Sequence, residues 1–370
     1  MGRKGCIKTC CSKNLFDDKI GYIVLFSIPL IPVSWLYGLI IYLRNLLYDS
    51  GILKIYRASV PVISVGNITV GGTGKTPFVE YLLRFYEKKG IKLCVISRGY
   101  KRLTKGMQVV SDGLHINGNA LTVGDEPYQI AKKFPRVMVV VSEKRSVAAE
   151  YMANYYKPDL FILDDGFQHR SMGRNLDVVV IDGQINLSKV QLLPAGPARE
   201  FKSALRRADV IVRSHTDQNI DPVVQKYFQE KVIDMRYKIK RFSSLLNDKF
   251  FEIDELRKKR CIAIAGIGNP DRFLQSLRDI KINIVAFRKY RDHYIYKEND
   301  LEEIRKIMET TKSDYIVTTE KDAMRLQSVE LPPGFPSNSI IYAIIEAIFV
   351  KGESVLWNIL NEKIDRLICE

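Results

Sequence analysis

The feature that most constrains the fold is the stretch of residues 60–77, which reads VPVISVGNITVGGTGKTP. Its first part is apolar and β-branched, which is typical of a buried strand. Glycines then interrupt the pattern and are followed by Lys75 and Thr76. Apolar residues recur at three- and four-residue spacing from Phe78 to Phe85, which predicts a helix with one buried face. A strand, a glycine-rich loop, Lys-Thr and a helix are the context that a P-loop requires.

In a P-loop, glycines let backbone N–H groups point at phosphate oxygens, and the helix N-terminus adds partial positive charge. Lys75 would reach the β- and γ-phosphates of a nucleotide, and Thr76 would bind Mg²⁺. The usual pattern has a glycine where this chain has Thr69, but Gly71 and Gly72 give the backbone freedom nearby. The alternative is a glycine-rich turn with a coincidental lysine.

A second motif, an acidic one, lies downstream. Residues 160–163 are apolar and predict a buried strand, and Asp164 and Asp165 follow at its carboxyl end. A carboxylate at this place is typical of a Walker B element, which binds the Mg²⁺ of a P-loop nucleotide. Ligands of open α/β sheets bind at the carboxyl ends of the strands. The two motifs together predict nucleotide-dependent phosphoryl transfer or hydrolysis, and a plain Asp-Asp-Gly turn is the alternative.

The remaining pattern predicts the domain organisation. Buried strands alternate with helices over short connections, which predicts an α/β fold with a doubly wound parallel sheet of the P-loop NTPase kind. The chain of 370 residues is long enough for two domains. We expect a P-loop domain over residues 49–232, and a linker over 233–246, where charged and aromatic residues alternate. A second, smaller α/β domain would follow over residues 247–370.

The N-terminal region has its own character. Residues 1–19 form a polar, basic tail without predicted structure, whereas residues 20–43 contain no charged residue. The uncharged run is long enough to span a bilayer, although Pro29 and Pro32 argue against one straight helix. It can span the membrane, lie in one leaflet or be a buried core helix. Because its aromatic residues suit a membrane interface, we favour a membrane-associated helical segment over residues 20–48.

The charge balance narrows the class of partner. The chain has 57 Lys and Arg against 42 Asp and Glu, a net charge of +15, which favours nucleic acid, an acidic membrane or a phosphorylated ligand. We expect no nucleic-acid partner, because the sequence has no zinc-finger, RRM or recognition-helix pattern. Its six cysteines include no C-x-x-C pair, which indicates a reducing compartment.

Several short motifs follow one another between residues 60 and 323. They are VGNITVGGTGKTP, SRGY, GDEP, DDGFQHR, LPAGPARE, AGIGNPDRF, RDHYIY and TTEKDA. In this order they closely resemble the tetraacyldisaccharide 4′-kinase family, the lipid A 4′-kinases of Gram-negative bacteria. The resemblance implies phosphorylation of the 4′-hydroxyl of a tetraacylated glucosamine disaccharide 1-phosphate by ATP and Mg²⁺, giving lipid IVA. It also implies a place at the cytoplasmic face of the inner membrane, on the lipid bilayer, and we expect no obligate protein partner.

The resemblance further implies roles for single residues. The ATP phosphates would be bound by Thr69, Val70, Gly71, Gly72, Thr73, Gly74, Lys75 and Thr76. The metal ion would be bound by Thr76, Asp164, Asp165 and Glu200. Asp125 of GDEP would be the catalytic base, His293 of RDHY its partner from the second domain, and Lys75 a further catalytic residue. A carboxylate–imidazole pair suits this task, because the His orients the Asp and the Asp accepts the hydroxyl proton.

Alternatives stay open at this stage. Asp125 can be an ordinary helix cap, and His293 a packing residue. Arg98, Arg145 and Arg199 can grip phosphates with their guanidinium groups or simply lie in solvent. For the whole chain, the alternative is a membrane-tethered P-loop NTPase switch or a transport ATPase. A nucleic-acid-binding ATPase is indicated only by the net charge.

Overall fold

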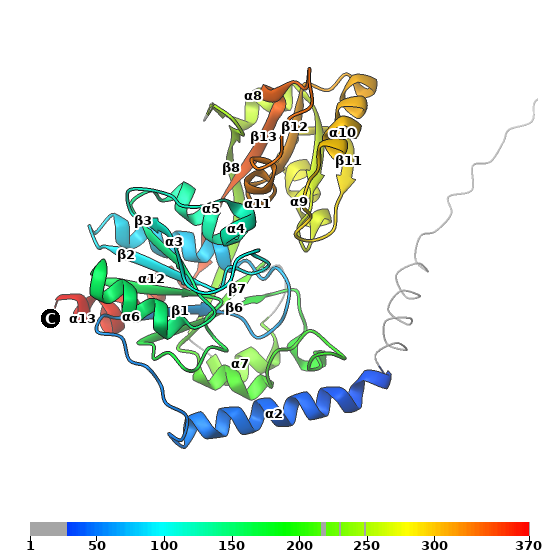
Figure 1. The fold of residues 1–370 in the computed structure, drawn as a ribbon. Helices are drawn as coiled ribbons and strands as arrows, with labels where there is room; N and C mark the ends of the chain where they lie inside the picture. Colours follow the sequence, from blue (N-terminus) through cyan, green and yellow to red (C-terminus); the bar gives the residue numbers. More distant parts are fainter. Residues whose placement is uncertain (1–27, 216–219, 229–230, 248, 370) are drawn as a thin grey trace, which may run out of the picture.

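The computed structural model describes residues 28–215, 220–228, 231–247 and 249–369 (Figure 1). The predicted basic tail of residues 1–19 lies outside these residues, as do residues 20–27 of the predicted apolar segment. The described chain forms two lobes, which are joined by a pair of long strands (Figure 1).

One mixed sheet runs through the described residues and confirms the predicted α/β fold. Its strands are β1 (Val62–Gly66), β2 (Leu93–Ser97), β3 (Gln108–Asp112), β4 (Met138–Val141), β5 (Leu160–Asp164), β6 (Leu176–Asp182), β7 (Val210–Ser214), β8 (Val232–Ser244), β9 (Phe250–Phe251), β10 (Arg260–Ala265), β11 (Asn283–Lys289), β12 (Tyr315–Thr319) and β13 (Ile340–Lys351). Their spatial order is β11-β10-β12-β13-β8-β7-β6-β1-β5-β2-β4-β3, with β9 paired to β8. We call the part built on β1–β7 the first lobe and the part built on β9–β12 the second lobe.

Helices cover both faces of the sheet. They are α2 (Ile31–Asp49), α3 (Lys75–Glu87), α4 (Ala120–Val123), α5 (Asp125–Lys133), α6 (Arg145–Tyr155), α7 (Pro222–Phe228), α8 (Ile253–Arg257), α9 (Pro270–Asp279), α10 (Glu298–Thr311), α11 (Glu320–Leu326), α12 (Glu353–Leu360) and α13 (Arg366–Cys369). In the first lobe, Ile63 of β1 lies in one apolar cluster with residues of α3 and α5. Its neighbour Val62 lies in another cluster, with residues of α6. Neighbouring residues of a strand point to opposite faces, so β1 is buried on both.

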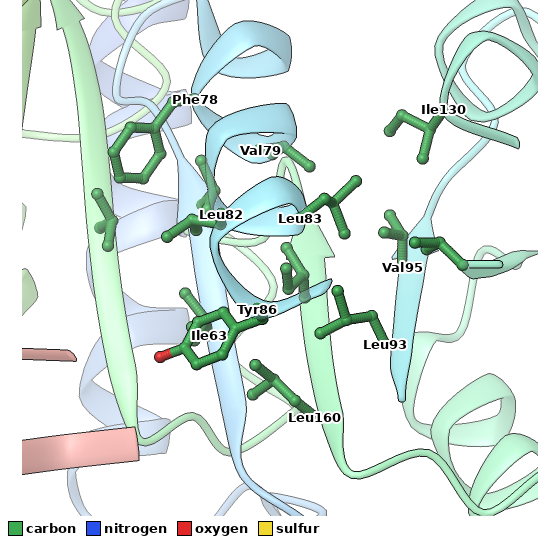
Figure 2. Packing of buried hydrophobic residues seen from close by; sticks show 14 of the residues in the cluster. Ile63, Phe78, Val79, Leu82, Leu83, Tyr86, Leu93, Val95, Ile130 and Leu160 are labelled. Atoms are coloured by element: carbon green, nitrogen blue, oxygen red, sulfur yellow. The ribbon is translucent and has the colours of Figure 1, made fainter. Parts of the chain in front are cut away.

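The core of the first lobe is built around α3 (Figure 2). The predicted apolar face is confirmed, since Phe78 and Leu82 are fully buried and Tyr81 and Phe85 pack against the same cluster. The side chains of α3 pack against the strands (Figure 2). This packing sets the position of the helix N-terminus relative to the sheet. The glycine-rich loop before this helix therefore begins and ends on rigid elements.

The segment expected to be a linker, residues 233–246, is for most of its length strand β8. Its first residues pair in parallel with β7 of the first lobe, and the rest pairs antiparallel with β13, with Tyr237 opposite Ala347. The alternation of charged and aromatic residues, which we interpreted as a connector, is the two-residue period of a strand with one exposed face. The lobes are therefore joined by a ribbon of β8 and β13 (Figure 1).

The end of the chain returns to the first lobe. Leu356 and Leu360 of α12, with Ile364 after it, are fully buried in the cluster that contains Ile63. These three residues recur at four-residue spacing and form one apolar face. The predicted C-terminal domain of residues 247–370 thus includes helices that belong to the core of the other lobe.

Helix α2 lies along the outside of the first lobe (Figure 1). Only Ser34, Gly38 and Ile41 of this helix are buried, so it is not a buried core helix. Pro32 lies in its first turn, where a missing N–H costs nothing. In the described part of the chain we find no helix that is both long and apolar enough to cross a membrane. The exposed apolar side chains of α2 are Val33, Trp35, Leu36, Leu39, Ile40, Tyr42, Leu43, Leu46 and Leu47.

The return of α12 gives a test of the fold. We expect Leu360→Ala to lower the free energy of unfolding by about 2–5 kcal/mol, because it leaves a cavity in the core of the first lobe. Asn358→Ala, at an exposed position of the same helix, should change it by less than about 0.5 kcal/mol. Urea unfolding followed by circular dichroism measures both. Equal effects of the two substitutions would contradict the placement of α12.

Candidate active site

The glycine-rich loop, residues 67–74, connects the carboxyl end of β1 to α3. Gly74 adopts a left-handed conformation with φ of 82°, and a Cβ atom there would overlap the hydroxyl of Tyr237. Tyr237 donates a hydrogen bond to the Gly74 carbonyl at 2.9 Å, and Ser214 Oγ donates one to the Thr73 carbonyl at 3.0 Å. Asn67 Nδ2 donates to Thr73 Oγ1 at 3.1 Å. Side chains from β7 and β8 thus hold the loop at the N-terminus of α3, where backbone N–H groups attract anions.

Lys75 and Asp165, which come from the two predicted motifs, meet at this end of the sheet. Lys75 Nζ lies 3.4 Å from Asp165 Oδ1. Arg199 Nη1 donates to both Asp165 oxygens, at 2.9 and 2.8 Å. Burial alone would raise the pKa of Asp165, but the charges of Lys75 and Arg199 outweigh it and lower the pKa. Asp165 is therefore an ionised partner of two cations.

Asp164 differs from its neighbour. It ends β5 in register with Val65 of β1 and is 2 % exposed. Ser97 Oγ donates to its Oδ2 at 3.2 Å, whereas its Oδ1 has no hydrogen-bond partner among the described residues. Burial, with the nearby charges of Glu126 and Asp165, raises the pKa of Asp164 to about 7. A buried carboxylate oxygen without a partner is costly unless a ligand or a cation satisfies it.

Asp125, at the start of α5, meets residues of the second lobe. His293 Nδ1 lies 3.1 Å from Asp125 Oδ2, and Arg325 Nη2 of α11 pairs with the same oxygen. Asp125 and Arg325 are each 5 % exposed. Burial would raise the pKa of Asp125, but the hydrogen bond from His293 and the charges of Lys321, Arg325 and His293 together lower it. The predicted Asp–His pair is thus brought together across the two lobes.

The backbone holds both partners of Asp125 in place. Gly266 O, which follows β10, accepts from His293 N at 3.1 Å and from Arg325 Nη1 at 2.9 Å. His293 has a positive φ of 60°, which is uncommon for a residue with a Cβ atom. Asp322 Oδ1 accepts from Arg325 Nη1 at 3.0 Å. One carbonyl oxygen of the second lobe, that of Gly266, therefore holds both residues that contact Asp125, namely His293 and Arg325.

Glu126 joins the same region to the start of α3. Its Oε1 accepts from Thr76 Oγ1 at 3.4 Å and pairs with Lys321 Nζ of α11. Reasoning from sequence missed Glu126, Lys321 and Arg325. A signal was present, since Lys321 and Arg325 are four residues apart and follow a buried strand, so they share one face of a helix that begins at the sheet edge.

Glu200, the remaining residue expected at the metal ion, is bonded to basic and amide side chains. The structure gives it other partners than the predicted metal residues: Arg207 donates to both of its oxygens, at 2.9 and 3.0 Å, and Asn45 of α2 donates at 2.8 Å. Arg44 lies 4.0 Å away, and Glu200 is 1 % exposed. Its charge is already compensated, so it ties α2 to the first lobe.

The three arginines differ in surroundings. Arg98 is exposed, and Arg199 is bound to Asp165. Arg145 is 5 % exposed, and its Nε has no hydrogen-bond partner among the described residues. The charges of Asp164 and Asp165 favour the ionised form of this guanidinium. We find no group of three or more Asp, Glu, His or Cys side chains in the described chain that could hold a metal ion. Beside the glycine-rich loop, Asp164 Oδ1 is an oxygen that fits a hard cation, because it is buried and unsatisfied.

The comparisons with known proteins agree with one another. Residues 26–365 match the family model described as tetraacyldisaccharide-1-P 4′-kinase. The chain is 40% identical to the tetraacyldisaccharide 4′-kinase of Chlorobaculum tepidum over 306 residues, 81% of this chain and 87% of that protein. It is 39% identical to that of Aquifex aeolicus over 303 residues, 81% of this chain and 90% of that protein. A crystal structure of "apo" form LpxK from Aquifex aeolicus in complex with ATP matches with a TM-score of 0.74 and 32% identity, over 90% of this chain and 99% of that chain.

The geometry of the loop predicts how it tolerates side chains. We expect Gly74→Ala to destabilise the protein by about 1–2 kcal/mol or more, because it combines a left-handed residue with overlap of Tyr237. Gly72→Ala is the matched control, since no atom lies within 4 Å of its added Cβ, and it should be neutral to within about 0.5 kcal/mol. Thermal unfolding distinguishes the two, and a tolerated Gly74→Ala would contradict the loop geometry.

Proposed function

Because the chain belongs to the tetraacyldisaccharide-1-P 4′-kinase family, we propose that it transfers the γ-phosphate of ATP to the 4′-hydroxyl of a tetraacylated disaccharide 1-phosphate. It is a kinase, and its reaction belongs to lipid A biosynthesis. The observation that carries the proposal at the level of the site is the Asp125–His293 pair, which lies one residue from Glu126 and its contact with Thr76. A hydroxyl acceptor needs such a group beside the phosphate site, whereas simple anion binding does not.

The ATP phosphates are assigned to the glycine-rich loop. Its geometry supports a P-loop, because the loop leads from a buried strand to the N-terminus of α3 and Lys75 lies at the first position of that helix. The backbone from Thr69 to Thr76 would surround the β- and γ-phosphates. Lys75 would bind them by exchanging or sharing its contact with Asp165. Arg145, buried and incompletely hydrogen-bonded, is the arginine best placed to bind a further phosphate oxygen.

Magnesium is assigned to Thr76, Asp164 and Asp165. The unsatisfied Oδ1 of Asp164 supports this, since Mg²⁺ prefers oxygen ligands and relieves a buried carboxylate of its desolvation cost. When bound, the ion would neutralise charge on the phosphates. Glu200, which the resemblance also implies at the metal, would have to exchange its contacts with Arg207 and Asn45 to bind the ion, as Asp165 would with Arg199.

Asp125 is assigned as the base. Its Oδ2 is occupied by His293 and Arg325, while its Oδ1 accepts the backbone N–H of Glu126 at 3.1 Å and has lone-pair capacity left. The hydrogen bond from His293 and the charge of Arg325 fix the carboxylate and favour its ionised form. Proton transfer from the 4′-hydroxyl to a carboxylate of low pKa is favourable only once the new P–O bond has begun to form, and the base then accepts the proton.

The acyl chains of the proposed substrate account for the exposed apolar side chains of α2. Four acyl chains keep the disaccharide in a membrane, since each buried CH₂ contributes about 0.8 kcal/mol. We assign the exposed apolar side chains of α2 to the membrane surface, with the helix lying in the interface. The net charge of +15 suits an acidic lipid surface. The proposed location is the cytoplasmic face of the bacterial inner membrane.

The proposal is tested with γ-labelled ATP, Mg²⁺ and tetraacyldisaccharide 1-phosphate in mixed micelles. Label should appear in a bisphosphorylated lipid. Lys75→Ala should reduce the rate by about 100-fold or more through loss of charge stabilisation, and Asp125→Asn by about 100- to 10,000-fold through loss of the base. Release of labelled inorganic phosphate with unmodified lipid would instead identify a membrane-tethered NTPase and contradict the kinase assignment.

The membrane assignment is tested by flotation with phosphatidylethanolamine–phosphatidylglycerol vesicles. Trp35→Ser with Leu39→Ser should weaken vesicle binding about tenfold or more, because each large apolar side chain contributes about 1.5–3 kcal/mol when buried. Leu114→Ser is the control, since Leu114 is 84% exposed but lies in the turn after β3, far along the chain from α2. Equal binding of both variants would remove α2 from the membrane contact.

A further inference from the structure

Lys321 brings a positive charge from the second lobe to the phosphate site of the first. It lies in the first turn of α11, and its Nζ pairs with Oε1 of Glu126. That same oxygen accepts the hydroxyl of Thr76, the second residue of α3, at 3.4 Å. One carboxylate oxygen therefore separates the ammonium group from the start of the helix that follows the glycine-rich loop.

The charge of this ammonium group also affects two further carboxylates. Its charge contributes to the lowered pKa of Asp125, the proposed base, and opposes the rise in the pKa of Asp164, the proposed metal-binding carboxylate. The other lysine of the site, Lys75, lies against Asp165, the residue after Asp164. The group is thus held by Glu126, the neighbour of the base in the chain, one carboxylate oxygen away from the helix start, where the reaction would transfer a phosphoryl group.

The ammonium group keeps donors that its contact with Glu126 does not use. An ammonium has three N–H donors, and its contact with Glu126 uses one. The Lys321 side chain is 29% exposed, whereas that of Arg325, one turn later on α11, is 5% exposed and is bonded to Asp125, Asp322 and Gly266. Arg325 is therefore fixed in a structural network, and Lys321 is the cation of α11 that a ligand can reach.

We propose that Lys321 is a catalytic residue that donates hydrogen bonds to the γ-phosphoryl oxygens and neutralises their charge during transfer. This inference rests on the proposed kinase function. In the step, the 4′-oxygen forms a bond to the γ-phosphorus and its proton passes to Asp125. The bond from the γ-phosphorus to the β–γ bridging oxygen breaks, and its electron pair leaves on ADP. Lys321 gives up no proton, so the step needs no further reactant.

The origin of Lys321 in the second lobe has a consequence for specificity. The charge that stabilises the transferring group is present only while α11 lies on α5. A bound ATP in a separated pair of lobes would lack this cation and the His293 contact to the base at the same time. Transfer to water is thereby disfavoured whenever the lobes are not docked.

The test compares Lys321→Met, Lys321→Gln and Lys321→Arg with the control Glu320→Gln. Glu320 is the neighbouring residue, and its carboxylate also crosses the lobes, to Lys133 at 2.6 Å and to Gln129 at 3.4 Å. Both neutral Lys321 variants should lower kcat by about 100-fold or more while the KM for ATP stays within about threefold. Lys321→Arg should recover about tenfold of this loss, and Glu320→Gln should keep kcat within about threefold of the wild type.

A binding measurement separates chemistry from folding. Titration calorimetry with ADP alone should give the same affinity for wild type and Lys321→Gln. With ADP, Mg²⁺ and aluminium fluoride, which imitates the transferring phosphoryl group, the wild type should bind about 100-fold more tightly than Lys321→Gln.

Two results would overturn the proposal. One is a kcat for the neutral Lys321 variants equal to that of Glu320→Gln, which would reduce Lys321 to an ion pair between the lobes. The other is an unchanged affinity of Lys321→Gln for the aluminium fluoride complex. Failure of the kinase assignment is distinct from both, because the wild type would then leave the lipid unphosphorylated.

Discussion

The structure depends on the contact of α5 with α11, where oppositely charged residues pair across the two lobes. The pairs are Asp125–Arg325, Glu126–Lys321 and Lys133–Glu320. Lys133 also pairs with Glu80 of α3 at 2.7 Å, so the contact extends to the helix that follows the glycine-rich loop. Asp125 and Arg325 are both buried, and removal of one partner from such a buried pair costs about 3–5 kcal/mol, because it leaves a charge uncompensated. Such an interface favours one relative position of the lobes over close alternatives.

That position is also the one that assembles the site. The first lobe supplies the loop, Lys75 and the carboxylates at the ends of its strands, and the second supplies His293, Arg325 and Lys321. The ribbon of β8 and β13 joins the lobes, and Tyr237 of this ribbon also supports the loop at Gly74. Tyr237 therefore belongs both to the ribbon that joins the lobes and to the support of the glycine-rich loop. Helix α2, which we propose to lie on the membrane surface, is tied to the first lobe through Glu200.

Local patterns predicted what depends on local physics. The strand, loop and helix of residues 60–87 and the Asp pair after β5 followed from burial period and turn residues alone. Residues 233–246 were expected to be a linker, and their strand character was missed because the two-residue period of β8 carries charged side chains on the face that lies outside the core. The role of Glu200 at the metal came from family resemblance, and its contact with Arg207 was not expected, because Arg207 lies in a 3₁₀ segment that the sequence did not indicate. The pairing of Asp125 with His293 came from family resemblance, because no local rule connects residues on separate lobes, and Arg325 and Lys321 were missed for the same reason.

The most direct test of the central claim is a double-mutant cycle of Asp125→Asn and Arg325→Met, measured as kcat/KM for lipid phosphorylation. If the second lobe acts by orienting the base, Arg325→Met should cost activity in the wild type and almost none in the Asp125→Asn background. The coupling free energy should then be about 1.5–3 kcal/mol. Additive losses, with a coupling near zero, would show that the contact across the lobes does not act through the base and would contradict the account.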